Sequence, residues 1–178
     1  YFVSLRKRVS IARKHQADLF VSLHANAFRL QSAQGASVYM LSEGGKPSPD
    51  KAIRRLVQRE NSADLIGGVN LNHVSDPTVR GILMDLTQRD SLNRALVYGK
   101  NVLGELKSVP SVNLHFRQVK QAGFAVLKAP DMPSILVEMA FLTNRKEEKM
   151  LRNNSHQNAL ASALASGTKK FINASGLA

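Results

Sequence analysis

Two spacings of hydrophobic residues run through the first part of this chain, and they predict a helix followed by two strands. Apolar residues first recur at helical spacing, at Phe2, Leu5, Val9 and Ala12. This spacing predicts an amphipathic helix with a basic outer face, up to about residue 16. The continuous apolar run 19–23 is instead typical of a strand buried on both faces of a sheet, and 35–41 is expected to be a second strand. The glycines and prolines of 43–49 predict a turn after the second run.

Helical spacing returns in the middle of the chain. Asp50 is the expected N-cap of a helix that ends at the glycine pair 67–68. A polar loop is expected over 70–77. A long helical pattern then covers about 78–107, with polar residues at 88–90 that suggest a break.

The last part of the chain predicts two more strands and a final helix. The apolar runs 124–127 and 134–137 are expected to be strands, and 155–171 a helix followed by a frayed tail over 173–176. Strands separated by helices predict an α/β fold, with a twisted, mostly parallel or mixed sheet and helices on both faces. At 178 residues the chain is long enough for one domain with a sizeable core.

Composition excludes several classes of protein. The chain is 43% hydrophobic and 21% charged, which is typical of a folded globular domain. No run approaches the roughly 20 apolar residues that a membrane helix needs. The absence of cysteine excludes disulfides and thiolate metal sites, and leaves both cytoplasm and periplasm open. Because the chain opens on Tyr1, we expect any targeting segment to lie upstream.

Net charge is the unusual bulk property. With 25 Lys and Arg against 13 Asp and Glu, the formal charge is +12, which favours an anionic partner. Nucleic acid is one candidate, but aromatic residues are only 6% and none is interleaved with the basic clusters as a base-stacking surface requires. A polyanionic matrix that carries carboxylates fits equally well, so charge alone leaves both alternatives open.

The candidate chemistry lies where two apolar runs end. The run 19–23 leads into His24, and the run 134–137 leads into Glu138. In an open α/β sheet, ligands bind beyond the carboxyl ends of the strands. We therefore expect the imidazole and the carboxylate to share one site, which points to metal binding or to acid–base chemistry.

Several blocks of the sequence carry a specific resemblance. Residues 17–26, followed by 35–39, resemble the central block of the zinc-dependent N-acetylmuramoyl-L-alanine amidases of the AmiA, AmiB and AmiC type. Residues 121–130, 133–138 and 141–144 are similar to the C-terminal block of the same family. Together the blocks cover essentially the whole chain in the family's order.

The resemblance implies a reaction and roles for two residues. These amidases hydrolyse the amide bond between N-acetylmuramic acid and the first L-alanine of the peptidoglycan stem peptide. In the family, Zn²⁺ is held by two histidines and a glutamate and keeps one position open for water. By position, His24 matches the last zinc-binding histidine, and Glu138 matches the glutamate that takes and returns the proton.

The chain departs from the family at its start. The first zinc-binding histidine and the zinc-binding glutamate of family members lie upstream of the position of Tyr1. The chain is therefore expected to be an N-terminally truncated part of a single amidase catalytic domain over 1–178, without its first strand. Alone, it is expected to hold zinc weakly and to be inactive. A non-catalytic peptidoglycan-binding fragment, or pseudo-enzyme, is the alternative that this departure leaves open.

The resemblance also implies regulation. An extra helical segment at about 47–90 is longer than the connection in simple family members. In the cell-division amidases such a helix covers the zinc cleft until an activator protein moves it. Glu60 is the first candidate for a carboxylate that plugs the open metal position, with Asp64 as the alternative. The expected partners are peptidoglycan and an activator, without nucleic acid or a membrane span, and the expected location is the periplasm.

Overall fold

The computed structural model describes residues 2–28, 30–63, 81–129 and 131–176. Its contacts divide the chain into two compact units. The first unit comprises Tyr1–Phe20, Met40–Arg94 and Gln121–Ser134, and the second comprises Val21–Tyr39, Ala95–Lys120 and Ile135–Ala178. The loop predicted over 70–77, the helix end at 67–68 and Asp64 lie outside the described residues.

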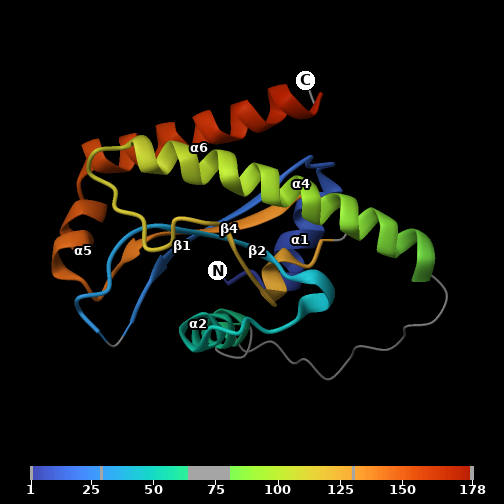
Figure 1. The fold of residues 1–178 in the computed structure, drawn as a ribbon, viewed down its shortest axis with the longest axis horizontal. Helices are drawn as coiled ribbons and strands as arrows, with labels where there is room; N and C mark the ends of the chain where they lie inside the picture. Colours follow the sequence, from blue (N-terminus) through green and yellow to red (C-terminus); the bar gives the residue numbers. More distant parts are fainter. Residues whose placement is uncertain (1, 29, 64–80, 130, 177–178) are drawn as a thin grey trace. The chain divides into compact units, whose positions relative to one another are not determined.

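Four strands form one hydrogen-bonded sheet in the order β1-β4-β2-β3 (Figure 1). Their bounds are β1 Phe20–Asn26, β2 Ser37–Leu41, β3 Lys120–Ala122 and β4 Ser134–Phe141. The Phe20 N–H donates to the Pro133 carbonyl at 3.0 Å, and the Leu142 N–H donates to the Asn26 carbonyl at 2.7 Å. Because residue numbers increase in the same direction in both pairs, β1 and β4 run parallel. The predicted α/β class is confirmed.

The two strands predicted near the start differ in their burial. All five residues of β2 are buried, as expected for a strand with neighbours on both sides. β1 is longer than the predicted run, and its expected burial on both faces is wrong, because Leu23 is 53% exposed. Ser22 and Asn26, which share one face of β1, are buried, whereas Leu23 on the opposite face is exposed.

The predicted first helix is confirmed as α1, Leu5–Lys14. Ser4 caps it by accepting a hydrogen bond from the Lys7 N–H at 3.3 Å. Val9 is buried against Ala129 and Met132, and Leu5 is also buried, so this part of the predicted apolar stripe packs. Phe2, its first member, lies before the helix and is 42% exposed.

The second helix also begins where the sequence predicts. α2 spans Lys51–Asn61, and the Asp50 carboxylate accepts hydrogen bonds from the N–H groups of residues 52 and 53. The predicted turn before it contains the short 3-10 helix η1, Glu43–Gly45. Gly44 and Gly45 both have φ values in the left-handed region, 62° and 67°, which only glycine adopts without strain.

The strand predicted over 124–127 is wrong, because these residues form the 3-10 helix η2, Ala125–Leu127. The Asn61 side chain explains the difference. Its amide donates to the Gly123 carbonyl at 3.0 Å, and its oxygen accepts from the Ala125 N–H at 2.8 Å. The backbone here therefore bonds to a side chain of α2 rather than to a neighbouring strand, and only β3, just before it, is extended.

The long helix α4, Gly81–Ser108, is continuous, so the predicted break at 88–90 is wrong. Arg89 and Asp90 are exposed on its surface, and Asp90 lies 4.0 Å from Arg94, one turn further along. Polar residues on an exposed helix face interrupt the apolar pattern without interrupting the helix.

The C-terminal region contains two helices. α6, Asn154–Ser175, confirms the predicted final helix and extends through the tail that was expected to fray. It ends at Gly176 in the left-handed conformation, which is a common helix terminator. α6 lies along the C-terminal half of α4 (Figure 1), where Tyr98 and Phe171 stack with ring centroids 5.1 Å apart. None of the described helices is both long and apolar enough to cross a membrane.

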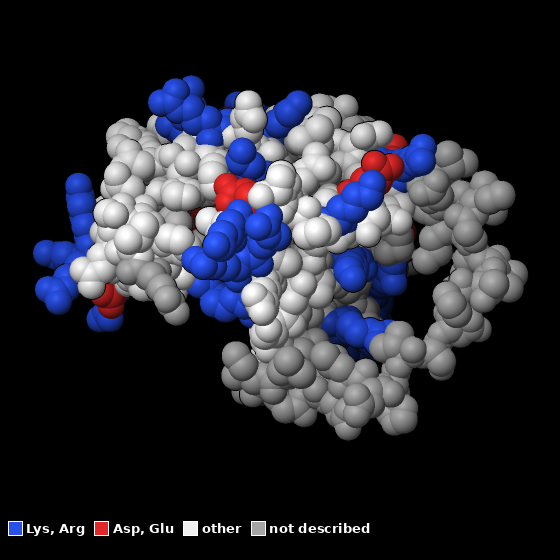
Figure 2. Space-filling model, turned by 60° about the horizontal axis from the view of Figure 1, so that its bottom comes forward, with Lys and Arg blue, Asp and Glu red and all other residues white. Residues whose placement is uncertain are grey.

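The excess of basic residues is visible on the surface. On the face drawn in Figure 2, Lys and Arg side chains are numerous and Asp and Glu are few. Several basic side chains hold acidic partners, as in the ion pair of Arg13 with Asp131 at 2.6 Å. Because Lys and Arg exceed Asp and Glu by 12 across the sequence, at least that many basic residues have no acidic counterpart within the chain.

Candidate metal centre

His24 lies within β1 and not beyond its end, so the expected position past the strand is corrected. Its side chain is half-buried and shares the strand face of Ser22, two residues earlier. The Ser22 hydroxyl and His24 Nε2 are hydrogen-bonded at 2.9 Å. Such a bond orients an imidazole ring and fixes which nitrogen carries the proton.

Glu138 likewise lies inside its strand, in the middle of β4. It is 1% exposed, and its neighbours Val137 and Leu136 are fully buried. Burying an ionised carboxylate is strongly unfavourable unless a cation or hydrogen bonds compensate the charge. A carboxylate at this place is therefore suited to a cation or to holding a proton.

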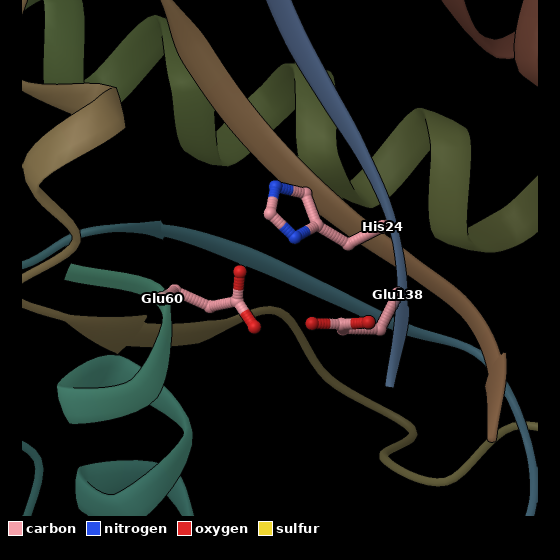
Figure 3. Close-up of side chains that lie close together, drawn as sticks. All are labelled: His24, Glu60 and Glu138. Carbon is pink, nitrogen blue, oxygen red and sulfur yellow. The ribbon is translucent and has the colours of Figure 1, made fainter. Parts of the chain in front are cut away.

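Parallel pairing of β1 with β4 brings His24 and Glu138 together (Figure 3). A ring nitrogen of His24 and a carboxylate oxygen of Glu138 lie within 4.8 Å of each other. Two ligand atoms that each lie about 2.0–2.3 Å from the same zinc ion are separated from each other by a distance similar to this limit or slightly shorter. An imidazole is a donor that zinc accepts, and a carboxylate this close to it can reach a water on the same metal, so the two residues fit the zinc that the family resemblance implies.

Glu60, the third residue labelled in Figure 3, belongs to α2 in the first unit. Its side chain is 16% exposed and accepts hydrogen bonds from the Arg59 guanidinium at 3.0 and 3.2 Å. The next residue, Asn61, fixes this end of α2 by its two bonds to the segment 123–125. The end of α2 that carries Glu60 is thus held at a defined place within its own unit.

A buried carboxylate that the sequence analysis missed supports the strand ends of the second unit. Glu147, on the short helix α5 (Arg145–Leu151), accepts hydrogen bonds from the N–H groups of Gly35 and Phe141, both at 2.7 Å. It thereby joins the chain before β2 to the last residue of β4. The capping residue Asn144, three positions before Glu147, was the sequence signal that could have revealed α5.

Solved structures share this fold. An N-acetylmuramoyl-L-alanine amidase from Clostridium difficile 630 matches 97% of this chain and 67% of its own, with a TM-score of 0.64 and 21% identity. AmiC2 of Nostoc punctiforme matches 97% of this chain and 68% of its own, with a TM-score of 0.59 and 24% identity. The arrangement of strands and helices described above is thus an amidase fold.

Sequence comparison gives the family. The model of the N-acetylmuramoyl-L-alanine amidase family (Amidase_3) matches residues 1–170, and the chain belongs to this family. The resemblance read from the sequence is confirmed.

AmiC of Neisseria meningitidis is 45% identical over 176 residues, which are 99% of this chain and 41% of that protein. AmiC of Escherichia coli is 44% identical over 171 residues, 96% of this chain and 40% of that protein. The chain thus spans about two fifths of the length of these curated relatives.

Proposed function

We propose that this chain forms the reaction centre of an N-acetylmuramoyl-L-alanine amidase, which hydrolyses the amide between N-acetylmuramic acid and L-alanine in peptidoglycan with the help of zinc. The observation that carries the proposal is the pair His24 and Glu138. Their ligand atoms lie within 4.8 Å on adjacent parallel strands, in a chain of the amidase family.

In this mechanism, His24 is a zinc ligand and Glu138 is the general base. When bound, zinc polarises the scissile carbonyl and lowers the pKa of the attacking water. Glu138 removes a proton from that water and delivers it to the nitrogen of the departing L-alanine, so that the amine leaves in neutral form. Ser22 keeps the imidazole of His24 in its orientation through the bond at Nε2.

The test uses the complete domain, since this chain alone is expected to hold zinc weakly and to be inactive, and it measures release of soluble fragments from dye-labelled sacculi together with zinc content. We expect Glu138→Gln to lower turnover by about three orders of magnitude or more while zinc remains bound, because a general base contributes on this scale. His24→Ala should lose zinc and activity together. Glu43→Gln and His15→Ala, which change exposed residues of the same types, serve as matched controls. Loss of zinc in Glu138→Gln would contradict the role of base, and wall binding without hydrolysis by the unmodified complete domain would identify a pseudo-enzyme.

The proposal includes regulation by the segment 47–90 within a single catalytic domain. In addition to His24 and Glu138, Glu60 is a third residue of a type that binds metal, and it belongs to α2 of the first unit. We place it at the open metal position in the resting enzyme, where its carboxylate displaces the hydrolytic water until an activator draws α2 away. The fixed end of α2 and the low exposure of Glu60 support this role.

A protein activator and a periplasmic location complete the proposal. CwlD of Clostridioides difficile, an amidase of the same fold with a TM-score of 0.61 and 24% identity, was solved in complex with the GerS lipoprotein. That precedent supports a protein partner for this chain. Hydrolysis of peptidoglycan in the periplasm during separation of daughter cells is the setting that we propose.

A further inference from the structure

A basic groove lies in the second unit, and none of the described residues that line it belongs to β1 or β4. It has a volume of about 470 Å³ and is formed by the C-terminal half of α4 and the segment 114–119. Three cationic side chains line it, those of Lys100, Lys107 and Arg117. Among the described residues that line it, none is acidic. Glu105, the nearest acidic position along α4, is held by Lys170 in an ion pair.

The floor of the groove is apolar and open. Leu103 is buried, and Leu114 and Val119 are half-buried. Gly104 lies on the same helix face as the two lysines, since positions 100, 104 and 107 are about one turn apart. A Cβ at Gly104 would meet nothing within 4 Å, so the absence of a side chain leaves space between the lysines.

We propose that this groove binds the stem peptide of peptidoglycan at a position that shares no residue with the metal centre. The inference rests on the proposed function, which makes the cell wall the substrate. A stem peptide is short and carries carboxylates beside the methyl groups of alanine. The cations of the groove pair with the carboxylates, and its leucines and valine receive the methyl groups. The groove thus holds the enzyme on the wall.

Size and shape favour this occupant over the alternatives. Cavities for small ligands have volumes of about 300–1,000 Å³, and the volume of the groove lies in this range. A folded protein partner instead covers an extended surface of about 800 Å² on each side. No aromatic side chain is among the described residues that line it, so it offers no surface on which nucleic-acid bases stack. Its apolar residues lie beneath the cations instead of projecting, which does not suit insertion into a membrane.

The test measures binding, independently of hydrolysis. Affinity of the protein for a soluble stem tetrapeptide is measured by titration calorimetry, and its retention on purified sacculi by sedimentation. Replacing Lys100, Lys107 and Arg117 together by Gln should weaken peptide binding by about tenfold or more, because charge-assisted hydrogen bonds are lost. A matched variant that replaces Arg145, Lys146 and Lys149 by Gln removes the same charge from exposed positions of α5 and should change affinity less than about twofold.

Gly104→Leu tests the groove without changing net charge. A leucine here fills open space on a helix surface and favours the helix, so the variant is expected to fold and to lose peptide binding. Equal losses of affinity in the two triple variants, or unchanged affinity in Gly104→Leu, would overturn the proposal that the peptide binds in this groove. Equal affinity for an unrelated acidic tripeptide, Glu-Ala-Glu, would overturn the stem peptide as its occupant. Peptide binding by a complete domain that hydrolyses nothing would still support the groove as a binding site, and would refute only the proposed function.

Discussion

Gly167 of α6 meets Val102 of α4 backbone against backbone: a Cβ at position 167 would lie 2.6 Å from the Val102 Cα. Real Cβ atoms essentially never approach so closely, so the separation of the two helices depends on the missing side chain. The close approach is what brings Tyr98 against Phe171 and within 2.8 Å of the Thr168 hydroxyl.

Gly167→Ala should therefore lower the free energy of unfolding by about 1–3 kcal/mol, the usual cost of overpacking a core. Chemical denaturation measures the change. Gly104→Ala is the matched control, because it adds the same methyl group to a helix where nothing lies within 4 Å. It should stabilise the protein by up to about 1 kcal/mol through helix propensity. Destabilisation of equal size in both variants would show that close packing is not the cause.

Tyr98 predicts a loss of stability at alkaline pH. Burial raises the pKa of its phenol above the usual 10.0, although the hydrogen bond with Thr168 partly opposes the shift. Above pH 10 the unfolded chain therefore releases this proton before the folded chain does, and the free energy of unfolding falls as pH rises. Below that pH the contribution is constant. Tyr98→Phe should be less stable than the unmodified protein at pH 8, and the difference should shrink as pH increases towards 11 in urea titrations. A difference that does not change with pH would contradict the raised pKa.

Glu147 should matter more than its exposed neighbour. Glu147→Ala leaves two buried N–H groups, those of Gly35 and Phe141, without their acceptor, which should cost about 2–5 kcal/mol of unfolding free energy. Glu148→Ala removes only an exposed ion pair with Arg152 and should cost less than about 1 kcal/mol. Thermal unfolding of the two variants gives the comparison, and equal midpoints would exclude the bridging role of Glu147.

Ser22 should affect the zinc affinity of the complete domain, although it is not a zinc ligand. Ser22→Ala removes the hydroxyl that orients His24, and the loss of such a supporting bond typically weakens metal binding by about 10–100-fold. Competition with a chromogenic chelator measures the affinity. Ser10→Ala, at an exposed position on α1, should leave it unchanged. If Ser22→Thr, which keeps the hydroxyl, failed to retain more affinity than Ser22→Ala, orientation by this bond would be the wrong explanation.

Glu60→Ala should raise hydrolysis of sacculi in the absence of any activator, because the carboxylate that competes with water is removed. Fragment release per unit time is the measurement, with folding verified by circular dichroism. Glu43→Ala changes a largely exposed carboxylate of the same unit and should leave the rate unchanged. Basal activity that stays the same or falls in Glu60→Ala would refute autoinhibition by this residue.

The parts of the fold that could be predicted are those that local physics determines. The N-cap at Asp50 and the buried strand β2 follow from residue type and apolar continuity alone. The run 124–127 could not be assigned in this way, since a short apolar run has no period and its conformation depends on Asn61, a residue distant in sequence. Tertiary contacts of this kind determine the conformation of such segments.

The candidate centre was predictable in its residues but not in its details. The order of residue types around His24 and Glu138 carried the family resemblance, and the structure brings these two side chains together. Their positions inside the strands could not be read from apolar runs, because a strand continues for as long as its neighbour pairs with it. Ser22 and Glu147 were missed because their importance lies in hydrogen bonds that only the folded chain makes.

The pairing of β1 with β4 also determines when, during synthesis of the chain, the candidate site can form. β1 leaves the ribosome before β4, which follows only after the whole of α4 has been translated. Contacts between segments so far apart form late, because the intervening chain must be ordered first. A nascent or prematurely terminated chain thus carries His24 without the carboxylate beside it. The pair formed by His24 and Glu138 can therefore exist only once β4 has been made.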